Sequence, residues 1–322
     1  MDHNLQKKLY FGMLRIRMVE EAIAARYQEQ EMRCPVHLCI GQEAIAVGVC
    51  ENLSKRDYVM STHRSHGHYL AKGGDLRALL AEIYGKAAGC SRGIGGSQHL
   101  VDLDAGFLGS TPIVGGIIPI AVGTALGSSM KGEDRVSVVF MGDAATETGA
   151  FSECLNFASL KKLPVVFVCE NNFFSVYSPL SVRQPARRNN ALLAESYGIY
   201  ADHGDGNNML EIYEKAAGAL KHVRRGGGPV YLEFATYRWR EHCGPDFDHH
   251  LGYRTESEYQ EWRGRCPLQH LEASLKNDGV IADDDIKAMR REISAEIDAA
   301  FQFAIASPFP AEEDLYNHLY AD

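Results

Sequence analysis

The sequence predicts a doubly wound α/β fold, a mostly parallel sheet with helices on both faces. Val136–Met141 and Val165–Cys169 are apolar runs without polar alternation, typical of strands buried on both faces of a parallel sheet. A helical segment at Gly149–Leu160 joins these runs into a βαβ unit. A further helix at Met209–Val223 leads to an apolar strand at Val230–Phe234, which continues the alternation.

The first 130 residues are predicted to be mainly helical. Apolar side chains recur at helical spacing over residues 5–29, and Gln42–Glu51 is a second helix, small and apolar enough for close packing. Residues 57–74 are dense in His and Gly and predict a loop with a short helix. Helices follow at Leu76–Tyr84 and at Ile117–Met130, whose small residues suit packing against another helix or subunit.

Two helical segments, about 255–275 and 283–306, close the chain. We therefore expect residues 1–322 to form a single domain. An N-terminal helical arm (about 1–35) and a C-terminal helical extension (about 255–322) would flank its sheet. A chain of 322 residues can bury enough surface to fold without disulfide or metal staples.

Composition excludes several classes of protein. The formal net charge of −9 argues against a nucleic-acid partner, although one or two local cations could still bind a small anion. The eight cysteines show no CxxC spacing and predict free thiols in a reducing compartment. No apolar stretch approaches the 18 or so residues of a membrane span, and the N-terminus resembles no signal or transit peptide. We expect a cytoplasmic protein without membrane contact.

Polar residues follow the two central strands directly. Asp143 comes after the first strand and Asn172 after the second, so they meet at one sheet edge if the strands are neighbours. A few oxygen ligands, completed by water and phosphate, are typical of a Mg²⁺–phosphate site. Small neighbours let the backbone approach a phosphate, and a helix starting near Thr146 would direct its N-terminus at it. These neighbours are Gly142, Ala144 and Ala145.

The stretch GDAATETGAFSECLNFASLKKLPVVFVCENN resembles the thiamine-diphosphate signature, GDG followed after 25–30 residues by NN. More closely, the chain resembles the α subunit of the E1 component of 2-oxo acid dehydrogenases, the pyruvate, branched-chain and acetoin dehydrogenase group. The resemblance covers most of residues 10–270 and implies the thiamine-diphosphate-binding fold. The other segments that carry it are VHLCIGQEAIAVG (36–48), GIGGSQHL (93–100), PIVGGIIPIAVGTAL (112–126), GPVYLEFATYR (228–238) and GYRTESE (252–258).

The resemblance implies two cofactors, thiamine diphosphate and Mg²⁺, and assigns residues to each. The side chains of Asp143 and Asn172 and the backbone carbonyl of Phe174 would hold the metal ion. Gly142, Ala144 and Ala145 would line the diphosphate, and Val114 would meet the aminopyrimidine through its backbone.

The run HRSHG (63–67) falls where the family has YRxHG. Arg64 would bind the diphosphate, a role that suits its planar fork of donors. His63 takes the place of a cofactor-contacting Tyr. His242, on a loop over the cofactor, would position the diphosphate and handle protons during acyl transfer. His242 and His66 are the expected catalytic residues.

The sequence departs from the family pattern at several positions. It has GDA in place of GDG, and Ile117 stands where a Gln is usual. The loop REHCGPDFDHH has Glu241 for Gly and Cys243 for the regulatory Ser of the family. These changes bear on the substrate and the acceptor rather than on the cofactor.

The resemblance implies an enzyme subunit that decarboxylates a 2-oxo acid, or cleaves an acyloin, and passes the acyl unit to a lipoyl or similar acceptor. A glutamate of a separate β subunit activates the cofactor in this family, so we expect an α₂β₂ heterotetramer, with a lipoyl-bearing E2 acyltransferase as a further partner. Two alternatives stay open: half of a split transketolase-like enzyme that makes C–C bonds, and a non-catalytic assembly subunit.

Other chemical interpretations are weaker. His63, His66 and His68 resemble a zinc cluster, but no fourth ligand is evident nearby. Cys243 next to His242 is a poor nucleophile candidate, because sequence neighbours rarely face each other. The glycines of residues 85–96 follow no apolar strand and are not a dinucleotide fingerprint. Arg224 and Arg225 are interpreted as solvated surface charges.

Overall fold

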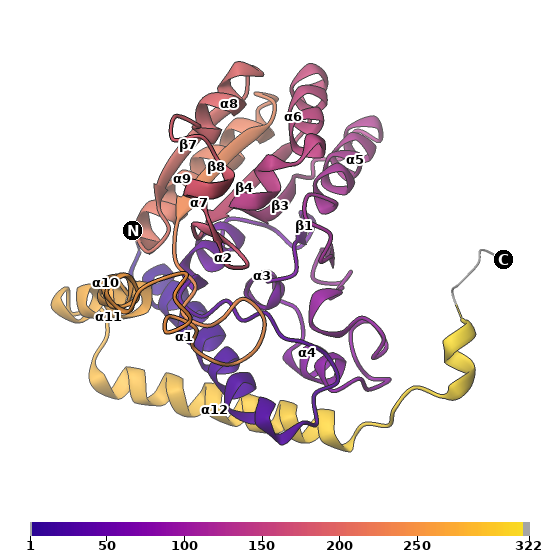
Figure 1. The fold of residues 1–322 in the computed structure, drawn as a ribbon, viewed down its shortest axis with the longest axis vertical. Helices are drawn as coiled ribbons and strands as arrows, with labels where there is room; N and C mark the ends of the chain where they lie inside the picture. The colour runs from indigo at the N-terminus through magenta and orange to yellow at the C-terminus, as the bar shows by residue number, and fades with distance from the viewer. Residues whose placement is uncertain (1, 318–322) are drawn as a thin grey trace.

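A computed structural model describes residues 2–317. Its centre is one sheet of six parallel strands (Figure 1). This confirms the predicted α/β class and its parallel sheet. The strands, in spatial order, are β2 (Phe107–Ser110), β1 (Tyr58–Ser61), β3 (Ser137–Gly142), β4 (Val165–Asn171), β8 (Val230–Ala235) and β7 (Tyr200–Asp205).

The predicted βαβ unit is present. β3 and β4 are neighbours in register, with Ser137 opposite Val165 and Gly142 opposite Glu170. Successive strand residues pack on opposite faces, because side chains alternate along a strand. Val138 and Phe140 contribute to one apolar cluster, whereas Val139 contributes to the other.

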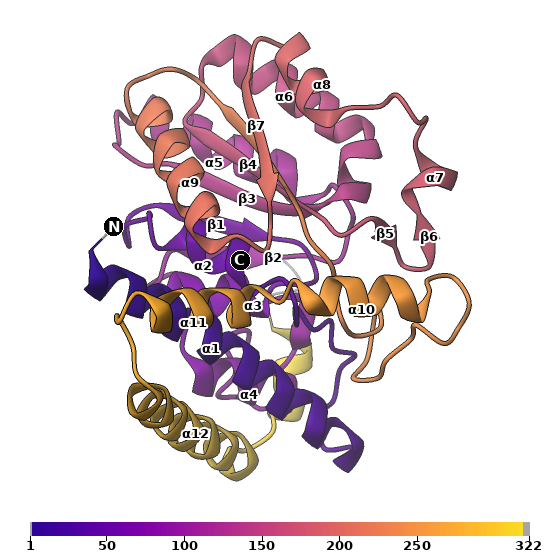
Figure 2. The same ribbon diagram turned by 90° about the vertical axis from the view of Figure 1, so that its left-hand side faces the viewer.

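The two faces of the sheet carry different helical layers (Figures 1 and 2). One face packs against α5 (Ile117–Met130), α6 (Gly149–Lys161) and α8 (Asn190–Ser196). The thicker layer on the other face comprises α1 (His3–Arg26), α2 (Glu43–Cys50), α3 (His66–Lys72), α4 (Leu76–Ile83), α9 (Met209–Arg224), α10 (Glu256–Gly264), α11 (Pro267–Asn277) and α12 (Asp283–Ala306).

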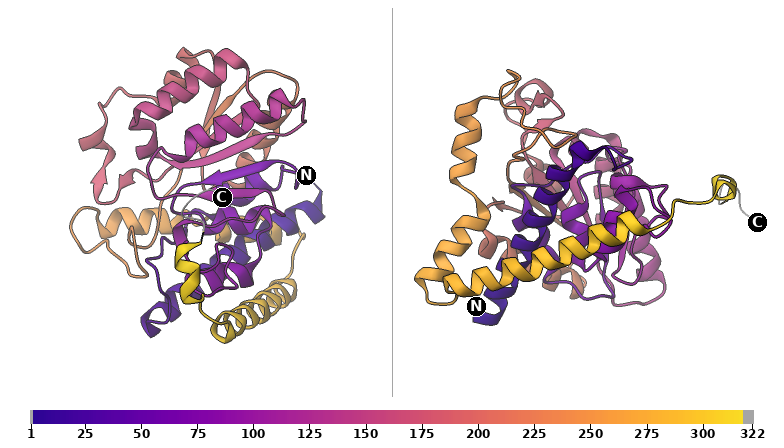
Figure 3. Two further views of the ribbon diagram at one scale, coloured as in Figure 1. Left: turned by 90° about the vertical axis from the view of Figure 1, so that its right-hand side faces the viewer. Right: turned by 90° about the horizontal axis from the view of Figure 1, so that it is seen from below.

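The remaining elements are short. A hairpin of β5 (Phe174–Ser175) and β6 (Ser178–Pro179) and the one-turn α7 (Leu180–Arg183) follow β4. After α12 the chain leaves the body of the molecule, as Figure 1 and the right-hand view of Figure 3 show. The 3₁₀ helices are Tyr27–Glu29, Gly96–Gln98, Asp143–Glu147 and Glu312–Tyr316.

Helix α2 packs as closely as its small residues predicted. A Cβ built on Gly48 would lie 2.7 Å from the Ile212 side chain of α9. A larger side chain at this position would push the two helices apart, because packed interiors hold little free volume.

Two local predictions were wrong. Residues 57–74 hold strand β1 before the short helix α3, so they are more than a loop and a helix. The helix after Asp143 does not start near Thr146. Asp143–Glu147 is a 3₁₀ helix, and Thr148, in an extended conformation at ψ 148°, separates it from α6.

None of the helices within residues 2–317 is both long enough and apolar enough to cross a lipid bilayer.

Candidate active site

A pocket lies at the carboxyl ends of the central strands, where ligands bind in open parallel sheets. It draws residues from segments far apart in the sequence, including the loops after β1, β3, β4 and β8. Its lining contains Arg64, His63, Val114, Gly142, Asp143, Ala144, Ala145, Asn172, Phe174 and His242. Of the residues proposed from the sequence, only His66 is absent from this lining.

Asp143 and Asn172 follow neighbouring strands and meet at the pocket, as the sheet register requires. Both are at least 92% buried. The Oδ1 of Asn172 accepts a hydrogen bond from the Phe174 N–H at 3.2 Å, which holds its amide beside the Phe174 backbone. The three groups proposed to bind a metal ion are therefore close together.

The Asp143 carboxylate has a protein partner. Arg183 of α7 forms an ion pair with it and also with Glu147. Burial raises the pKa of Asp143, and the hydrogen bond and charge of Arg183 oppose that rise. A metal ion at Asp143 would have to share this carboxylate with Arg183 or displace it.

Arg64 is a buried cation without a matching anion. Its guanidinium donates to the Leu38 carbonyl at 2.6 Å and to the His242 carbonyl at 3.1 Å, and it forms no ion pair with any residue from 2 to 317. Burial and the nearby Arg238 charge lower the pKa of Arg64 to about 10. A buried unpaired charge is costly, so the position suits an anionic ligand.

The pocket also offers an unused donor and open space. The Nε2 of Gln42 is buried and makes no hydrogen bond, although the residue lines the pocket. A Cβ built on Gly142 would meet nothing within 4 Å, so the backbone there faces free volume. A buried cation, an orphaned donor and open backbone fit a diphosphate group, and the Asp143 and Asn172 oxygens fit its metal ion.

Three histidines converge at the pocket. The ring centroids of His37, His63 and His242 lie 4.8–5.3 Å apart. Burial is the main cause that lowers their pKa values, to about 2 for His37 and about 3 for His63 and His242, and the Arg64 charge adds to it. All three imidazoles are therefore neutral near pH 7.

The structure places His66 away from the pocket, which argues against its predicted catalytic role. Its side chain is fully buried, with Nδ1 2.6 Å from the Glu20 carboxylate and Nε2 2.7 Å from the Ser97 hydroxyl. Both ring nitrogens are occupied, so neither is available to a substrate. His66 instead ties α1 to the start of α3 and to the 3₁₀ helix at Gly96–Gln98.

The weaker interpretation of His63, His66 and His68 as a zinc cluster finds no support in their positions. His68 is turned into the core, where its ring contacts Ser61 at 2.8 Å and Glu170 at 3.1 Å. Since α3 begins at His66, its first turn carries His66 and His68 away from His63.

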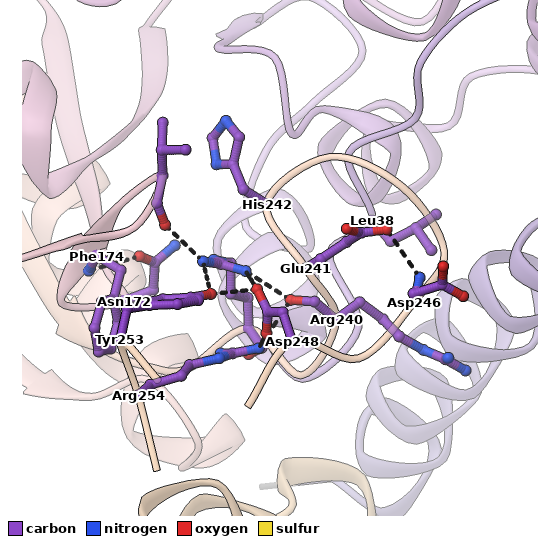
Figure 4. Close-up of polar contacts among 12 residues, drawn as sticks. Leu38, Asn172, Phe174, Arg240, Glu241, His242, Asp246, Asp248, Tyr253 and Arg254 are labelled. Carbon is purple, nitrogen blue, oxygen red and sulfur yellow. Dashed lines mark hydrogen bonds and ion pairs between the residues drawn. The ribbon is translucent and has the colours of Figure 1, made fainter. Parts of the chain in front are cut away.

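The loop that carries His242 is fixed by a buried charge network (Figure 4). Asp248 forms ion pairs with Arg238 and Arg254, and all three side chains are almost fully buried. Tyr253 also donates its hydroxyl hydrogen bond to Asp248. In Figure 4 the His242 ring points away from this network and takes no part in it, which leaves its nitrogens free.

Sequence reasoning missed His37, Gln42, Gln98 and Glu170 as pocket residues. His37 and Gln42 lie within the segment 36–48 that carried part of the resemblance, so that segment was the available signal. It contained no strand end that would have marked them as facing a ligand.

The chain resembles known proteins over nearly its whole length. Residues 11–313 match the family described as dehydrogenase E1 component. The chain is 38% identical to the α subunit of acetoin:2,6-dichlorophenolindophenol oxidoreductase of Bacillus subtilis, over 97% of this chain and 92% of that protein.

Pyruvate dehydrogenase E1 α subunits are similarly related. Identity is 35% to that of Porphyra purpurea, over 98% of this chain and 92% of the relative. It is also 35% to a chloroplastic form of Arabidopsis thaliana, over 98% of this chain and 74% of the relative. These matches show that the chain belongs to the dehydrogenase E1 component family, among its α subunits.

Proposed function

We propose that this protein is the α subunit of a thiamine-diphosphate- and Mg²⁺-dependent E1 enzyme. It would decarboxylate a 2-oxo acid, or cleave an acyloin, and pass the acyl unit to a lipoyl or similar acceptor. The observation that carries the proposal is the uncompensated Arg64 cation in the same pocket as Asp143 and Asn172. The named functions of the pyruvate and acetoin relatives support the same class of reaction.

Each pocket group has a role in this proposal. Asp143, Asn172 and the Phe174 carbonyl would hold Mg²⁺, and Arg64 would neutralise the diphosphate. When bound, the cofactor supplies a nucleophilic carbon and an electron sink for the cleavage. Val114, at 47% exposure on the pocket rim, would contact the aminopyrimidine through its backbone.

The histidines would serve as neutral hydrogen-bonding groups. His63 would contact the cofactor. The neutral ring of His242 has one nitrogen that accepts and one that donates a hydrogen bond, and it would handle protons during acyl transfer through these bonds.

We propose that activity requires a β-like subunit in an α₂β₂ heterotetramer. Large apolar side chains are exposed in residues 94–113 and along α5, which is typical of a protein interface. They are Ile94, Leu103, Ile113, Ile120 and Met130. A lipoyl-bearing acyltransferase as acceptor partner and a cytoplasmic location belong to the same proposal.

Calorimetry with thiamine diphosphate, with and without Mg²⁺, tests the proposal on the chain alone and on the chain co-expressed with its β-like partner. We expect metal-dependent binding that Asp143→Ala abolishes and that Asp134→Ala, at a surface carboxylate 78% exposed, preserves. Absence of binding in both preparations would favour the non-catalytic assembly subunit. Binding without 2-oxo acid or acyloin turnover, but with ketose transfer, would favour the transketolase-like alternative.

A further inference from the structure

His37, His63 and His242 come together from three separate segments of the chain. His37 precedes α2, His63 lies between β1 and α3, and His242 is on the loop after β8. One ring nitrogen of each can be chosen so that the three atoms lie within 4.8 Å of one another. Packing of the loops, rather than sequence spacing, creates this convergence.

The nitrogens of this trio are largely free to bind a ligand. The ring of His37 has one polar contact, 3.3 Å from its Nδ1 to the Gln98 amide nitrogen. The rings of His63 and His242 make no hydrogen bond to any residue from 2 to 317. Neutral imidazole is the form that coordinates a metal ion, and all three pKa values lie far below 7.

The geometry is close to that of a catalytic zinc centre. Zn–N bonds of about 2.0–2.1 Å place the nitrogens of a tetrahedral site about 3.4 Å apart. The trio therefore has to contract by at most about 1.4 Å, which side-chain rotations can provide. Three imidazoles with an open fourth position are the ligand set of a zinc ion that keeps one water.

The surrounding charge is mixed. Arg64 lies beside the trio and opposes a cation, whereas Asp143 and Glu170 in the same pocket favour one. The oxygen ligands at Asp143 and Asn172 suit Mg²⁺, while nitrogen ligands suit a softer ion, so the pocket can separate the two metals by ligand type.

We propose that His37, His63 and His242 form a tridentate site for a divalent transition metal of the zinc class, with its fourth position open to water in the pocket. The site lies beyond the proposed function, which uses Mg²⁺ and free imidazoles. Occupancy would engage His63 and His242, so a zinc-class ion would inhibit any reaction that needs these rings.

Titration of the metal-free full-length chain with Co²⁺ tests the site without cofactor or partner. We expect one equivalent to give the intense visible absorption of tetrahedral Co²⁺ and Zn²⁺ to displace it. Substitution of a residue that only hydrogen-bonds to a metal ligand typically lowers metal affinity 10–100-fold. His63→Phe removes a ligand itself, so it should lower the affinity about 100-fold or more. His203→Gln, at an exposed histidine of β7, is the matched control and should bind as the unmodified chain does.

Folding is checked separately by thermal denaturation without metal. Zn²⁺ should raise the melting temperature of the unmodified chain and of His203→Gln but not of His63→Phe. If His63→Phe unfolds, His242→Asn on the surface loop provides the same comparison.

Equal affinity in all variants, a weak octahedral Co²⁺ spectrum, or no binding at all would overturn the inference. These measurements use no thiamine diphosphate. Failure of the metal-site proposal can therefore be told apart from failure of the proposed function.

Discussion

At the scale of single residues, the charge of Arg64 is expected to contribute to the affinity of the pocket for diphosphate. Arg64→Met removes a buried cation of the pocket that forms no ion pair with any residue from 2 to 317, so diphosphate affinity should fall about 10–100-fold, the value of a charge-assisted hydrogen bond. The free energy of unfolding should change by less than about 1 kcal/mol, because two lost carbonyl contacts are offset by relief of a buried charge.

Calorimetry with Mg²⁺ and thiamine diphosphate, paired with urea denaturation, measures both quantities. Arg64→Lys is the control that keeps the charge but loses the planar fork, and its affinity should lie between those of the other two proteins. Unchanged cofactor affinity in Arg64→Met would show that the cation serves the fold only.

Substitution of His66 is expected to lower stability rather than cofactor affinity. His66→Ala removes the imidazole partner of the buried Glu20 carboxylate, which keeps the hydrogen bond from the Cys39 N–H at 2.5 Å. We expect a loss of about 2–4 kcal/mol in unfolding free energy. Cofactor affinity of the folded fraction should change little, since the ring does not reach the pocket. Urea denaturation and calorimetry separate these effects, and a large fall in affinity at unchanged stability would restore the catalytic role.

At the scale of elements, one carboxylate joins strands β1 and β3. Asp57 is fully buried and accepts hydrogen bonds from the Val136 N–H at 3.0 Å, from Ser54 at 2.8 Å, and from Arg224 at 2.6 Å. Arg224 was expected to be a solvated surface charge, but α9 ends where its guanidinium reaches this acid. The sequence could not show this contact, because the partners are distant along the chain.

Asp57→Asn should lower the unfolding free energy by about 2–4 kcal/mol, since the buried pair with Arg224 is broken. Asp134→Asn, which removes the other acid near Arg224, should cost less than about 0.5 kcal/mol because Asp134 is mostly exposed. Urea denaturation measures both. A similar cost for the two variants would contradict the role of burial.

The Asp57 carboxyl also makes the free energy of unfolding depend on pH. Burial favours the neutral acid, but the hydrogen bonds from Val136, Ser54 and Arg224 outweigh it and lower the pKa of Asp57 below its ordinary 3.8. The unfolded chain thus binds this proton more readily than the folded one. The stabilisation is complete above about pH 5 and is lost as the pH falls through the lowered pKa. In urea denaturation at a series of pH values, Asp57→Asn should reduce the loss of unfolding free energy at acidic pH. An unchanged loss would assign this pH dependence to other groups.

At the scale of the whole molecule, the proposed assembly with a β-like partner makes its prediction at α5. A Cβ on Gly123 or Gly127 would meet nothing within 4 Å, and Ile120 is exposed beside them. Gly123→Leu should leave the isolated chain as stable or more stable, because glycine in a helix costs about 1 kcal/mol relative to alanine. It should also weaken assembly with the β-like partner, because the added side chain blocks close approach.

Gly218→Leu on α9 is the matched control, since that glycine is also exposed on a helix with open space around it. Analytical ultracentrifugation of the co-expressed pair should show dissociation for Gly123→Leu only. Intact assembly in both variants would place the interface elsewhere.

The sequence by itself determined the central parallel strands and the meeting of Asp143 with Asn172. Both follow from local patterns: apolar runs without alternation mark strands buried on two faces, and the polar residues stand where those strands end. The edge strand β7 escaped prediction, because its pairing comes from backbone hydrogen bonds to β8 while none of its residues is buried.

Only the tertiary structure decided which histidines share a site. Within HRSHG, His63 faces the pocket with His37 and His242, whereas His66 turns into the core to meet Glu20. The start of α3 sets the direction of each ring, and α1 supplies the buried acid that holds His66. Sequence spacing carries no information about these partners, because the path of the chain through three separate loops brings them together.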